Sequence, residues 1–254
     1  MAKIGIQISS FKPLLTTPEG VLEVFRKVKA LGYTYAQLQW IDPSVPDEAI
    51  RDALQESGLE CLSTQEYYEL YMADIDHVIR QNKMWGSKDI CLSGIPKDMR
   101  SVEGINEMVS RMTPLLYRLK DEGITLSYHP RSQEFDLFDG VSGFDRIVDG
   151  MPDDMRICLD LFHTEKVGLD SAALIRKYDG RIDMVHFKDD RTFPDGTREL
   201  TPIGQGHINW QPIISAVNAT RVQYALAEQE TWLSDPYECF AQSYAYITGS
   251  GIEK

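Results

Sequence analysis

Residues 156–188, RICLDLFHTEKVGLDSAALIRKYDGRIDMVHFK, contain two short apolar runs on either side of an amphipathic stretch. The runs at 156–162 and 183–188 have the length and composition of buried strands. Between them, residues 170–180 place apolar side chains three and four positions apart and end on a glycine, which is typical of a helix and its C-terminal cap. This order predicts two parallel strands joined by a crossover helix.

The same alternation continues along all 254 residues. Amphipathic stretches such as 18–32, 47–58 and 105–123 lie between strand-like runs. The eight runs are 3–9, 35–40, 59–64, 89–94, 124–129, 156–162, 183–188 and 223–229. Eight such units predict a single-domain (β/α)8 TIM barrel over residues 1–254, because that α/β fold has a usual size of about 250 residues. The alternative is a doubly wound open sheet, but no G-x-G-x-x-G follows the first run.

Composition restricts the possible partners. The chain is 43% hydrophobic and 26% charged, with a formal net charge of −13. This charge repels nucleic acid and anionic membranes, so neither is expected as a partner. The N-terminal MAKIGIQISS lacks the features of a signal peptide, and the absence of a long apolar segment predicts a cytoplasmic protein. Reduced, buried thiols are expected for the four scattered cysteines, Cys61, Cys91, Cys158 and Cys239.

Polar residues gather where the predicted strands end, and the active site of a TIM barrel lies at the C-terminal ends of its strands. The residues at these ends are His129, Asp160, His163, His186, Lys188, Glu228 and Glu230. Because residues two apart in a strand share a face, Asp160, His186 and Glu228 are expected to point inward from neighbouring strands, with His129 beside them. These side chains predict a ring of four potential ligands.

Two imidazoles and two carboxylates form a mixed nitrogen and oxygen set, which suits Mn²⁺, Zn²⁺, Co²⁺ or Fe²⁺. Without a cation, Asp160 and Glu228 would repel each other in a medium of low dielectric constant. In the alternative interpretation each residue is structural: His186 is a hydrogen-bonded core histidine, Asp160 pairs with Lys188, and Glu228 pairs with an arginine. Four such residues at adjacent strand ends favour the metal site.

Several motifs, taken in order, resemble a known family. They are GYTYAQLQW (32–40), YHPRSQEF (128–135), LDLFH (159–163), VHFKDD (185–190), PIGQGHINW (202–210) and ALAEQE (225–230). In order and spacing they are similar to the sugar phosphate isomerase/epimerase superfamily of xylose isomerase-like TIM barrels, from Ile4 to about Tyr246. YHPRSQEF resembles the Y-H-N-H-x-x-E-F segment of the branch that includes inosose dehydratases.

The resemblance implies a divalent ion, often manganese, held by a glutamate, an aspartate, a histidine and a glutamate on strands five to eight. Asp160, His186 and Glu228 match the last three of these ligands, while His129 stands at the position of the first. The ketose 3-epimerases of this superfamily use two facing glutamates, one on each side of the sugar, and this chain lacks one of them. Glu228 or His163 would then serve as the base, and Lys188 would bind a hydroxyl or stabilise enediolate charge.

The remaining candidates lie near the mouth of the barrel. Arg131 and Glu134, on the loop after the fifth strand, and Glu66, after the third, are predicted to contact substrate. Trp40, with Tyr67 and Tyr68, is expected to form an apolar wall against a sugar face. Alternatives stay open: Lys188 as a purely ion-paired residue, His129 as an acid/base or as a histidine oriented by Glu134, and Glu228 as a ligand only. His207 is assigned to a loop, and His77 to a helix surface.

The predicted function is that of a metal-dependent isomerase or epimerase of a small sugar or keto-sugar, acting next to a polarised carbonyl. Manganese is the first choice of metal, with zinc, cobalt, iron or magnesium as alternatives. A lyase of the same fold, acting on an inosose, a keto-sugar or a keto-glycoside, is the second hypothesis. The third is an inactive barrel that binds a sugar or a protein partner, and a homo-oligomer is allowed. Five histidines and a net charge of −13 argue against an endonuclease.

Overall fold

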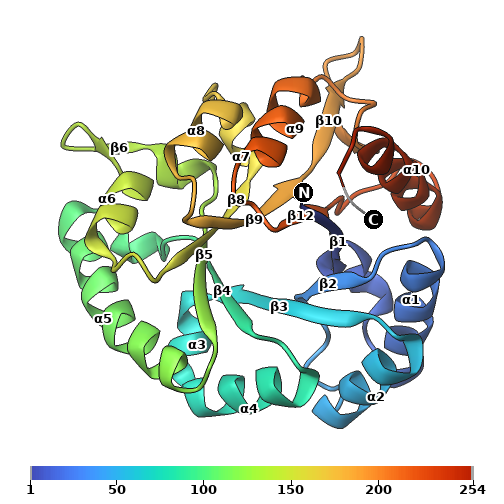
Figure 1. Cartoon of the computed structure of the whole chain (residues 1–254), viewed down its shortest axis with the longest axis horizontal. Coiled ribbons are helices and arrows are strands. Elements are labelled where there is room, and N and C mark those ends of the chain that lie inside the picture. Colours follow the sequence, from blue (N-terminus) through green and yellow to red (C-terminus); the bar gives the residue numbers. More distant parts are fainter. Residues whose placement is uncertain (1, 253–254) are drawn as a thin grey trace.

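The structure is a computed structural model that describes residues 2–252. Parallel strands close into a barrel in the order β1-β12-β9-β8-β5-β4-β3-β2, with the helices arranged around it (Figure 1). The barrel strands are β1 (Lys3–Gln7), β2 (Tyr35–Leu38), β3 (Glu60–Tyr67), β4 (Asp89–Ser93), β5 (Thr125–His129), β8 (Arg156–Asp160), β9 (Ile182–Phe187) and β12 (Tyr224–Ala227). The closed parallel barrel confirms the predicted single-domain (β/α)8 fold.

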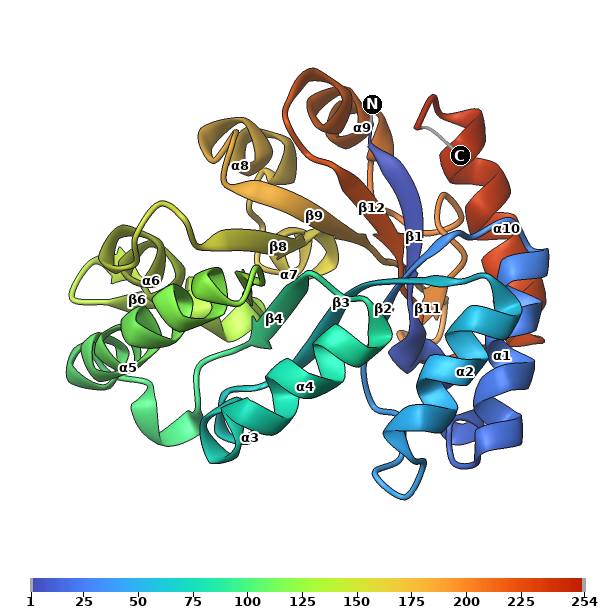
Figure 2. The same cartoon turned by 60° about the horizontal axis from the view of Figure 1, so that its bottom comes forward.

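Helices follow the barrel strands and cover the outside of the barrel. They are α1 (Pro18–Ala30), α2 (Asp47–Ser57), α3 (Tyr68–Ala73), α4 (Ile75–Trp85), α5 (Val102–Asp121), α6 (Gly143–Gly150), α7 (Leu161–Lys166), α8 (Ser171–Lys177), α9 (Trp210–Ala219) and α10 (Pro236–Gly249). Short 3₁₀ helices are η1 (Ile8–Leu14), η2 (Lys97–Met99) and η3 (Ser132–Phe135). Figure 2 shows α2 and α4 side by side outside β2 and β3.

Local sequence signals account for the helix ends. The Thr17 side chain accepts a hydrogen bond from Gly20 N at the start of α1, and Pro18 occupies the first turn. Ser101 caps α5 in the same way, through Gly104 N. At the other end of α2, Gly58 adopts a φ of +69°, a left-handed conformation that glycine reaches without steric cost.

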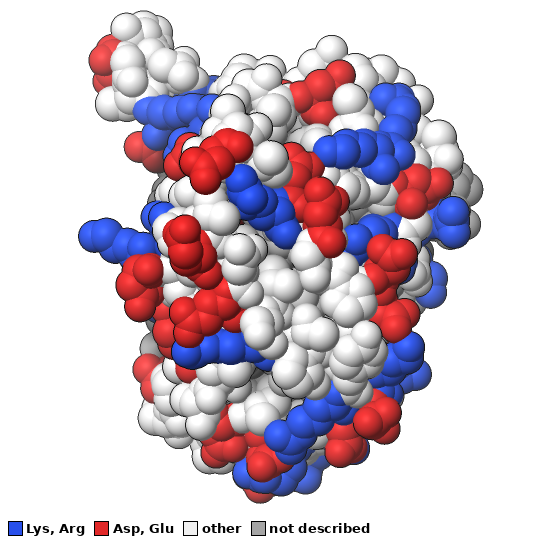
Figure 3. All heavy atoms as spheres, turned by 90° about the vertical axis from the view of Figure 1, so that its left-hand side faces the viewer, with Lys and Arg blue, Asp and Glu red and all other residues white. Residues whose placement is uncertain are grey.

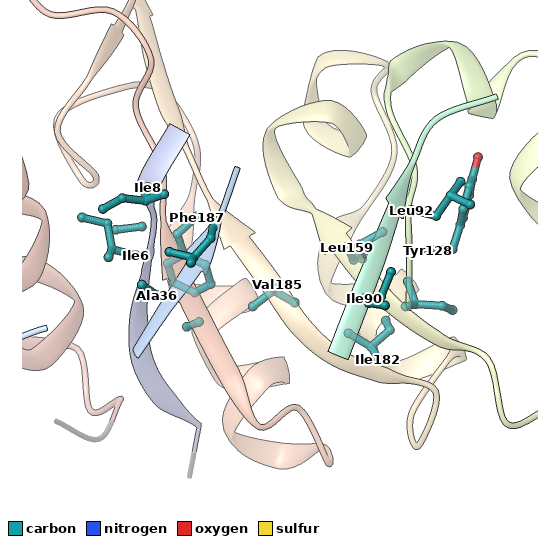
Figure 4. Close-up of a cluster of buried hydrophobic side chains, with 14 of the residues drawn as sticks. Ile6, Ile8, Ala36, Ile90, Leu92, Tyr128, Leu159, Ile182, Val185 and Phe187 are labelled. Carbon is teal, nitrogen blue, oxygen red and sulfur yellow. The ribbon is translucent and has the colours of Figure 1, made fainter. Parts of the chain in front are cut away.

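Alternation along the strands produces two layers of side chains. Outward-facing apolar residues pack between the barrel and its helices, and Figure 4 shows members of this layer, among them Ile6, Leu92 and Phe187. The residues between them point inward and are largely polar: Gln7, Gln37, Ser63, Asp89, Ser127, Asp160 and His186 are all buried. The barrel interior is therefore able to position functional groups as well as to pack.

Two short antiparallel hairpins interrupt the strand and helix alternation, and neither was predicted. The first pairs β6 (Leu137–Phe138) with β7 (Val141–Ser142), after β5. The second pairs β10 (Asp189–Thr192) with β11 (Arg198–Thr201), directly after β9. Because it follows the C-terminal end of a barrel strand, the second hairpin extends the wall of the barrel mouth.

The surface and the cysteines agree with the composition. On the face drawn in Figure 3, acidic and basic side chains are interspersed. The four cysteines are free and buried, as predicted. Within residues 2–252, no helix combines the length and the apolar character needed to cross a bilayer.

Candidate functional site

Three buried side chains converge at the C-terminal ends of β5, β8 and β9. The Nε2 atom of His129 lies 3.2 Å from Nδ1 of His186 and 3.6 Å from Oδ2 of Asp160. Nδ1 of His186 lies 4.0 Å from the same aspartate oxygen. Strand alternation accounts for this convergence, because each of the three side chains points into the barrel from a neighbouring strand. We call these residues the His129–Asp160–His186 group; together they can hold a metal ion.

Glu228 and Lys188 flank this group. Oε2 of Glu228, in the residue after β12, lies 3.0 Å from Nδ1 of His186. The ammonium of Lys188 lies 3.2 Å from Glu228 Oε2, 3.5 Å from Asp160 Oδ2 and 2.8 Å from Glu230 Oε1. Lys188 is therefore the cation that balances the carboxylates here, and Asp189 is not among its partners.

Backbone structure holds Asp160 in place. One oxygen, Oδ1, accepts a hydrogen bond from His163 N at 3.1 Å and so caps the N-terminus of α7. The other oxygen, Oδ2, faces the histidines. The carboxylate is thus fixed by the turn that leads from β8 into α7, and one oxygen remains free to act as a ligand.

The chemistry of the donor atoms fits a divalent ion. Asp160 Oδ2 and Glu228 Oε2 are buried, and among the described residues no donor makes a hydrogen bond of good geometry with either oxygen, although Lys188 Nζ lies 3.5 and 3.2 Å away and His186 Nδ1 lies 3.0 Å from Glu228. Unsatisfied buried carboxylate oxygens are costly unless a cation compensates them. Donors bound to one ion at about 2.1 Å lie about 3.0 to 3.4 Å apart. The distances of 3.2 to 4.0 Å between the three ligand atoms are close to that spacing.

The local charges decide which groups are ionised. Burial opposes ionisation of Asp160, but the positive charge of Lys188 holds the pKa of its carboxyl well below the usual range. The pKa of Glu228 falls to about 2 against the same effect of burial, because of Lys188 and His186. Burial and the charge of Glu228 raise the pKa of Glu230 to about 7. Both inner carboxylates are therefore anionic at neutral pH.

His163 lies at the rim of the group. Its Nε2 is 3.8 Å from Asp160 Oδ2, and its Nδ1 is 2.9 Å from the hydroxyl of Ser132. Burial lowers the pKa of His163 to about 4, so the imidazole is neutral at pH 7. A neutral imidazole at this distance is placed to exchange a proton with a bound molecule.

A cavity of about 480 Å³ opens next to these groups. His163, Lys188 and Glu230 line its inner side, while Phe162 of α7 and residues 198–200 of β11 line its outer side. The ammonium of Lys188 lies 5.5 Å from the centre of the Phe162 ring. The residues of the hairpin were absent from the predicted site because the hairpin itself was not predicted. Phe162 of α7 was not among the predicted site residues either.

Arg131 and Glu134 occupy different places on the loop after β5. The guanidinium of Arg131 lies over the ring of Tyr67, 5.6 Å from its centre. Glu134 is fully buried, and its carboxylate accepts hydrogen bonds from the backbone amides of Ile95 and Arg131. Glu134 was predicted to face substrate or to orient His129. Instead its carboxylate holds the loop together, and the partner of His129 Nδ1 is the hydroxyl of Ser93, at 3.3 Å.

Trp40 and Glu66 lie together, but away from the His129–Asp160–His186 group. Both line a cavity of about 410 Å³ between the loop after β2 and helix α4. Burial raises the pKa of Glu66 to about 7. Trp40 adopts a φ of +58°, and Lys12 Nζ lies 4.8 Å from its ring centre. Contact of these two residues with substrate stays a prediction.

The remaining aromatic and histidine candidates have structural or surface positions. Tyr67 packs under Arg131, and Tyr68 begins α3 with its side chain buried. His207 donates from Nδ1 to the backbone oxygen of Asp190, so it belongs to the loop, as predicted. His77 lies on α4 with 47% of its side chain exposed, also as predicted.

Asp189 is an organising residue that the motif VHFKDD did not reveal. It is fully buried, and its carboxylate accepts hydrogen bonds from the backbone amides of Gly204 and Gly206 and from Trp210 Nε1 at 2.8 Å. It thereby anchors the loop PIGQGHINW beside β9. Gly206 must be glycine here, because a Cβ atom would lie 2.0 Å from Asp189 Oδ1.

Comparison with solved structures finds the same architecture. A sugar phosphate isomerase/epimerase from Parabacteroides distasonis superposes with a TM-score of 0.81 at 17% identity, covering 100% of this chain and 96% of that one. The 3-keto-D-glucoside 4-epimerase of E. coli gives 0.69 at 18% identity, with 98% and 100% covered. A probable 3-DHS dehydratase from Bacillus anthracis gives 0.71 at 15% identity, with 98% and 99% covered. At these identities the similarity establishes the fold.

Sequence comparison identifies the family. No curated protein matches the chain in sequence. The family model described as xylose isomerase-like TIM barrel matches residues 25–238, from within α1 to the first turn of α10. This match includes β5, β8, β9 and β12, which carry the His129–Asp160–His186 group and Glu228. The chain therefore belongs to the xylose isomerase-like TIM barrel family.

Proposed function

We propose that the protein is a divalent-metal-dependent isomerase or epimerase of a small sugar or keto-sugar, acting by proton abstraction next to the substrate carbonyl. The substrate class is a small polyhydroxylated carbonyl compound. Membership of the family and the similarity to two sugar-converting enzymes support this proposal. Mn²⁺ is the metal that we expect first, because a set of two imidazoles and two carboxylates suits a borderline divalent ion.

One observation supports the proposal above the others: two buried carboxylate oxygens, Asp160 Oδ2 and Glu228 Oε2, lie beside two imidazole nitrogens, all aimed at one place inside the barrel. His129, Asp160, His186 and Glu228 would hold the ion. When bound, a divalent ion supplies Lewis-acid polarisation of the substrate carbonyl. The same charge compensates the two carboxylates, which Lys188 alone balances only in part.

The side chains around the ring then have distinct tasks. Glu228 or His163 removes the proton from the carbon next to the carbonyl. Lys188 donates a hydrogen bond to a substrate oxygen and stabilises the negative charge that develops there. Phe162 and residues 198–200 exclude water from one side of the cavity. Arg131, Trp40 and Glu66 are proposed to contact more distant parts of the substrate.

His129 supports proton transfer on a single face of the substrate. Epimerisation through two opposed carboxylates needs one on each side of the reacting carbon, and here the strand-five position carries an imidazole 3.2 Å from His186. Return of the proton to the neighbouring carbon by the residue that removed it leads to isomerisation. Epimerisation at the same carbon needs a second donor on the opposite face, and His163, after it takes a proton from solvent, is the candidate for that donor.

A lyase is the second candidate, and the similarity to a probable dehydratase favours it. The first step is the same. If a hydroxyl or alkoxide leaves from the β-carbon after proton removal, the product is an enone rather than an isomer. The Lys188 and Glu230 pair, 2.8 Å apart at the edge of the cavity, is placed to protonate such a leaving group.

Metal analysis and incubation in D₂O test these proposals together. The purified protein, loaded with Mn²⁺, is offered ketoses and keto-glycosides. Solvent deuterium in an intact isomeric product supports the isomerase, and an enone absorbing in the ultraviolet supports the lyase. Absence of bound metal and of both products would favour an inactive, sugar-binding barrel.

Matched carboxylate variants check the role of Glu228. Glu228→Gln is expected to lower kcat by about 10²- to 10⁴-fold, because it removes both a ligand and a base. Glu19→Gln, on the exposed surface of α1, is the control and should leave kcat unchanged. Full activity of Glu228→Gln would contradict the proposed site.

A further inference from the structure

A cluster of buried glutamines lies inside the barrel next to His186. Gln7 ends β1, Gln37 lies in β2, Gln39 follows β2, and Gln65 lies in β3. All four are at most 5% exposed. Amides that are buried so deeply need hydrogen-bond partners, so the orientation of each amide shows which neighbouring atoms donate and which accept.

The orientation of Gln7 follows from a backbone group. Its Oε1 accepts a hydrogen bond from Ser9 N at 3.0 Å, and a backbone N–H can only donate. The Nε2 of Gln7 is therefore the end that faces the other glutamines. It donates to Oε1 of Gln37 at 2.8 Å and approaches Gln39 and Gln65 at 3.4 Å.

The orientation of Gln37 follows in turn. Its Oε1 must face Gln7, because two NH₂ groups in that place would repel each other. Its Nε2 then points to the hydroxyl of Ser63, at 3.3 Å. The same Oε1 lies 2.8 Å from Nε2 of His186, across the barrel from β9. The Cys158 Sγ lies 3.2 Å from the same nitrogen and can accept weakly. An amide oxygen only accepts, so Nε2 of His186 must carry a hydrogen.

From these contacts we propose that Gln37 is a positioning residue that keeps a proton on Nε2 of His186 and thereby presents the lone pair of Nδ1 to the metal. Nδ1 is the nitrogen that faces His129 and Glu228. Without an ion, Nδ1 shares a hydrogen with the Glu228 carboxylate 3.0 Å away, and an ion would take the place of that hydrogen. The inference rests on the metal centre of the proposed function. It adds that the ligand atom of His186 is selected from β2, by a chain of hydrogen bonds that starts at a backbone amide.

The partner of His129 differs in kind from the partner of His186. The partner of His129 Nδ1 is the hydroxyl of Ser93, and a hydroxyl can either donate or accept. Ser93 therefore does not determine which nitrogen of His129 carries the proton. A change of strand register between Ala36 and Gln37, where β2 pairs with β3, also affects the backbone at Gln37, and irregularities of this kind re-aim side chains near functional sites.

Calorimetric titration with Co²⁺ tests the proposal. Gln37→Met keeps the shape of the side chain and removes the acceptor, so Co²⁺ affinity should fall by about 10- to 100-fold. Gln37→Glu keeps an acceptor towards His186 and should remain within about threefold of the native affinity. Gln65→Met is the matched control: it removes an amide from the same cluster that has no contact with His186, and its affinity should also stay within about threefold.

Nitrogen-15 NMR of the metal-free native protein reads the proton position directly. We expect a proton on Nε2 of His186, and a neutral ring protonated on Nδ1 would overturn the proposal even if Gln37→Met failed to fold. Unchanged Co²⁺ affinity in Gln37→Met, or an equal loss in Gln65→Met, would also overturn it. If the native protein binds no Co²⁺, the proposed metal centre fails, and the NMR result still decides the role of Gln37.

Discussion

Replacement of Asp89 by asparagine is expected to stabilise the protein above neutral pH. Asp89 begins β4 and is buried inside the barrel, where it accepts hydrogen bonds from Ser63 Oγ at 2.6 Å and from Ser127 Oγ. Burial outweighs these bonds and raises the pKa of the carboxyl from 3.8 to about 7. The folded state therefore favours protonated Asp89, and the stability that this provides is lost as the pH rises from about 4 to 7.

The magnitude follows from the raised pKa. One pKa unit is worth about 1.4 kcal/mol, so burying the anion costs about 4 kcal/mol well above pH 7. Asparagine carries no charge and still accepts from Ser63, but its NH₂ group forces the Ser127 hydroxyl to turn, at a cost of about 1 kcal/mol. Asp89→Asn should therefore raise the free energy of unfolding by about 3 kcal/mol near pH 8. Near pH 4 it should lower that free energy by about 1 kcal/mol.

Urea denaturation of the native protein and of Asp89→Asn between about pH 4 and pH 8.5 measures this difference. All other titrating groups are shared, so they cancel. Asp121→Asn, which removes a charge from an exposed position at the end of α5, should change stability by less than about 0.5 kcal/mol and controls for net charge. A free-energy difference that does not change with pH, or an Asp89→Asn variant less stable than the native protein at pH 8, would refute the reasoning.

Three further outcomes are expected. Asp189→Asn should destabilise the protein by about 3 kcal/mol, because its NH₂ group must face N–H donors in either orientation: those of Gly204, Gly206 and Trp210 at the Oδ2 position, or the backbone amides of Asp190 and Ile208 at the Oδ1 position; limited proteolysis should show faster cleavage within residues 202–210. Glu134→Gln should cost about 1 to 3 kcal/mol in urea denaturation, since one of two backbone donors loses its acceptor. Mn²⁺ at about a hundredfold excess over its Kd should add about 2.7 kcal/mol of stability, seen as a higher Tm that Asp160→Asn abolishes.

The barrel was predictable because its signal is repeated and local. Each strand is a short apolar run, and each long helix has an amphipathic period with caps such as Thr17 and Gly58. The β10–β11 hairpin carries no such signal. Residues 189–201 are mostly polar, and polar contacts within the hairpin hold them, such as the pairing of Arg198 with Asp190. A search for apolar periodicity in the sequence therefore could not predict this hairpin, which forms one wall of the cavity next to Lys188.

Some residues of the candidate site were predictable from the sequence, and others were not. His129, Asp160 and His186 were brought together by one rule, the convergence of strand ends in a barrel. Gln37 was overlooked because its contact with His186 spans 149 positions of sequence. Glu134 was misplaced because a polar residue after a strand resembles a rim residue. Its spacing of three from Arg131, typical of a capping interaction, was the available signal that it serves the backbone.

The attachment of the β10–β11 hairpin has a consequence for how such enzymes diversify. The hairpin lies between β9 and an anchored loop. Arg198, Glu199 and Leu200 line the cavity, and none of them belongs to the His129–Asp160–His186 group. The length and sequence of the hairpin can therefore change without altering the barrel strands. A new substrate can then be acquired by insertion or exchange in one exposed segment. Transplanting residues 191–200 between relatives would be an economical route to altered specificity with unaltered chemistry.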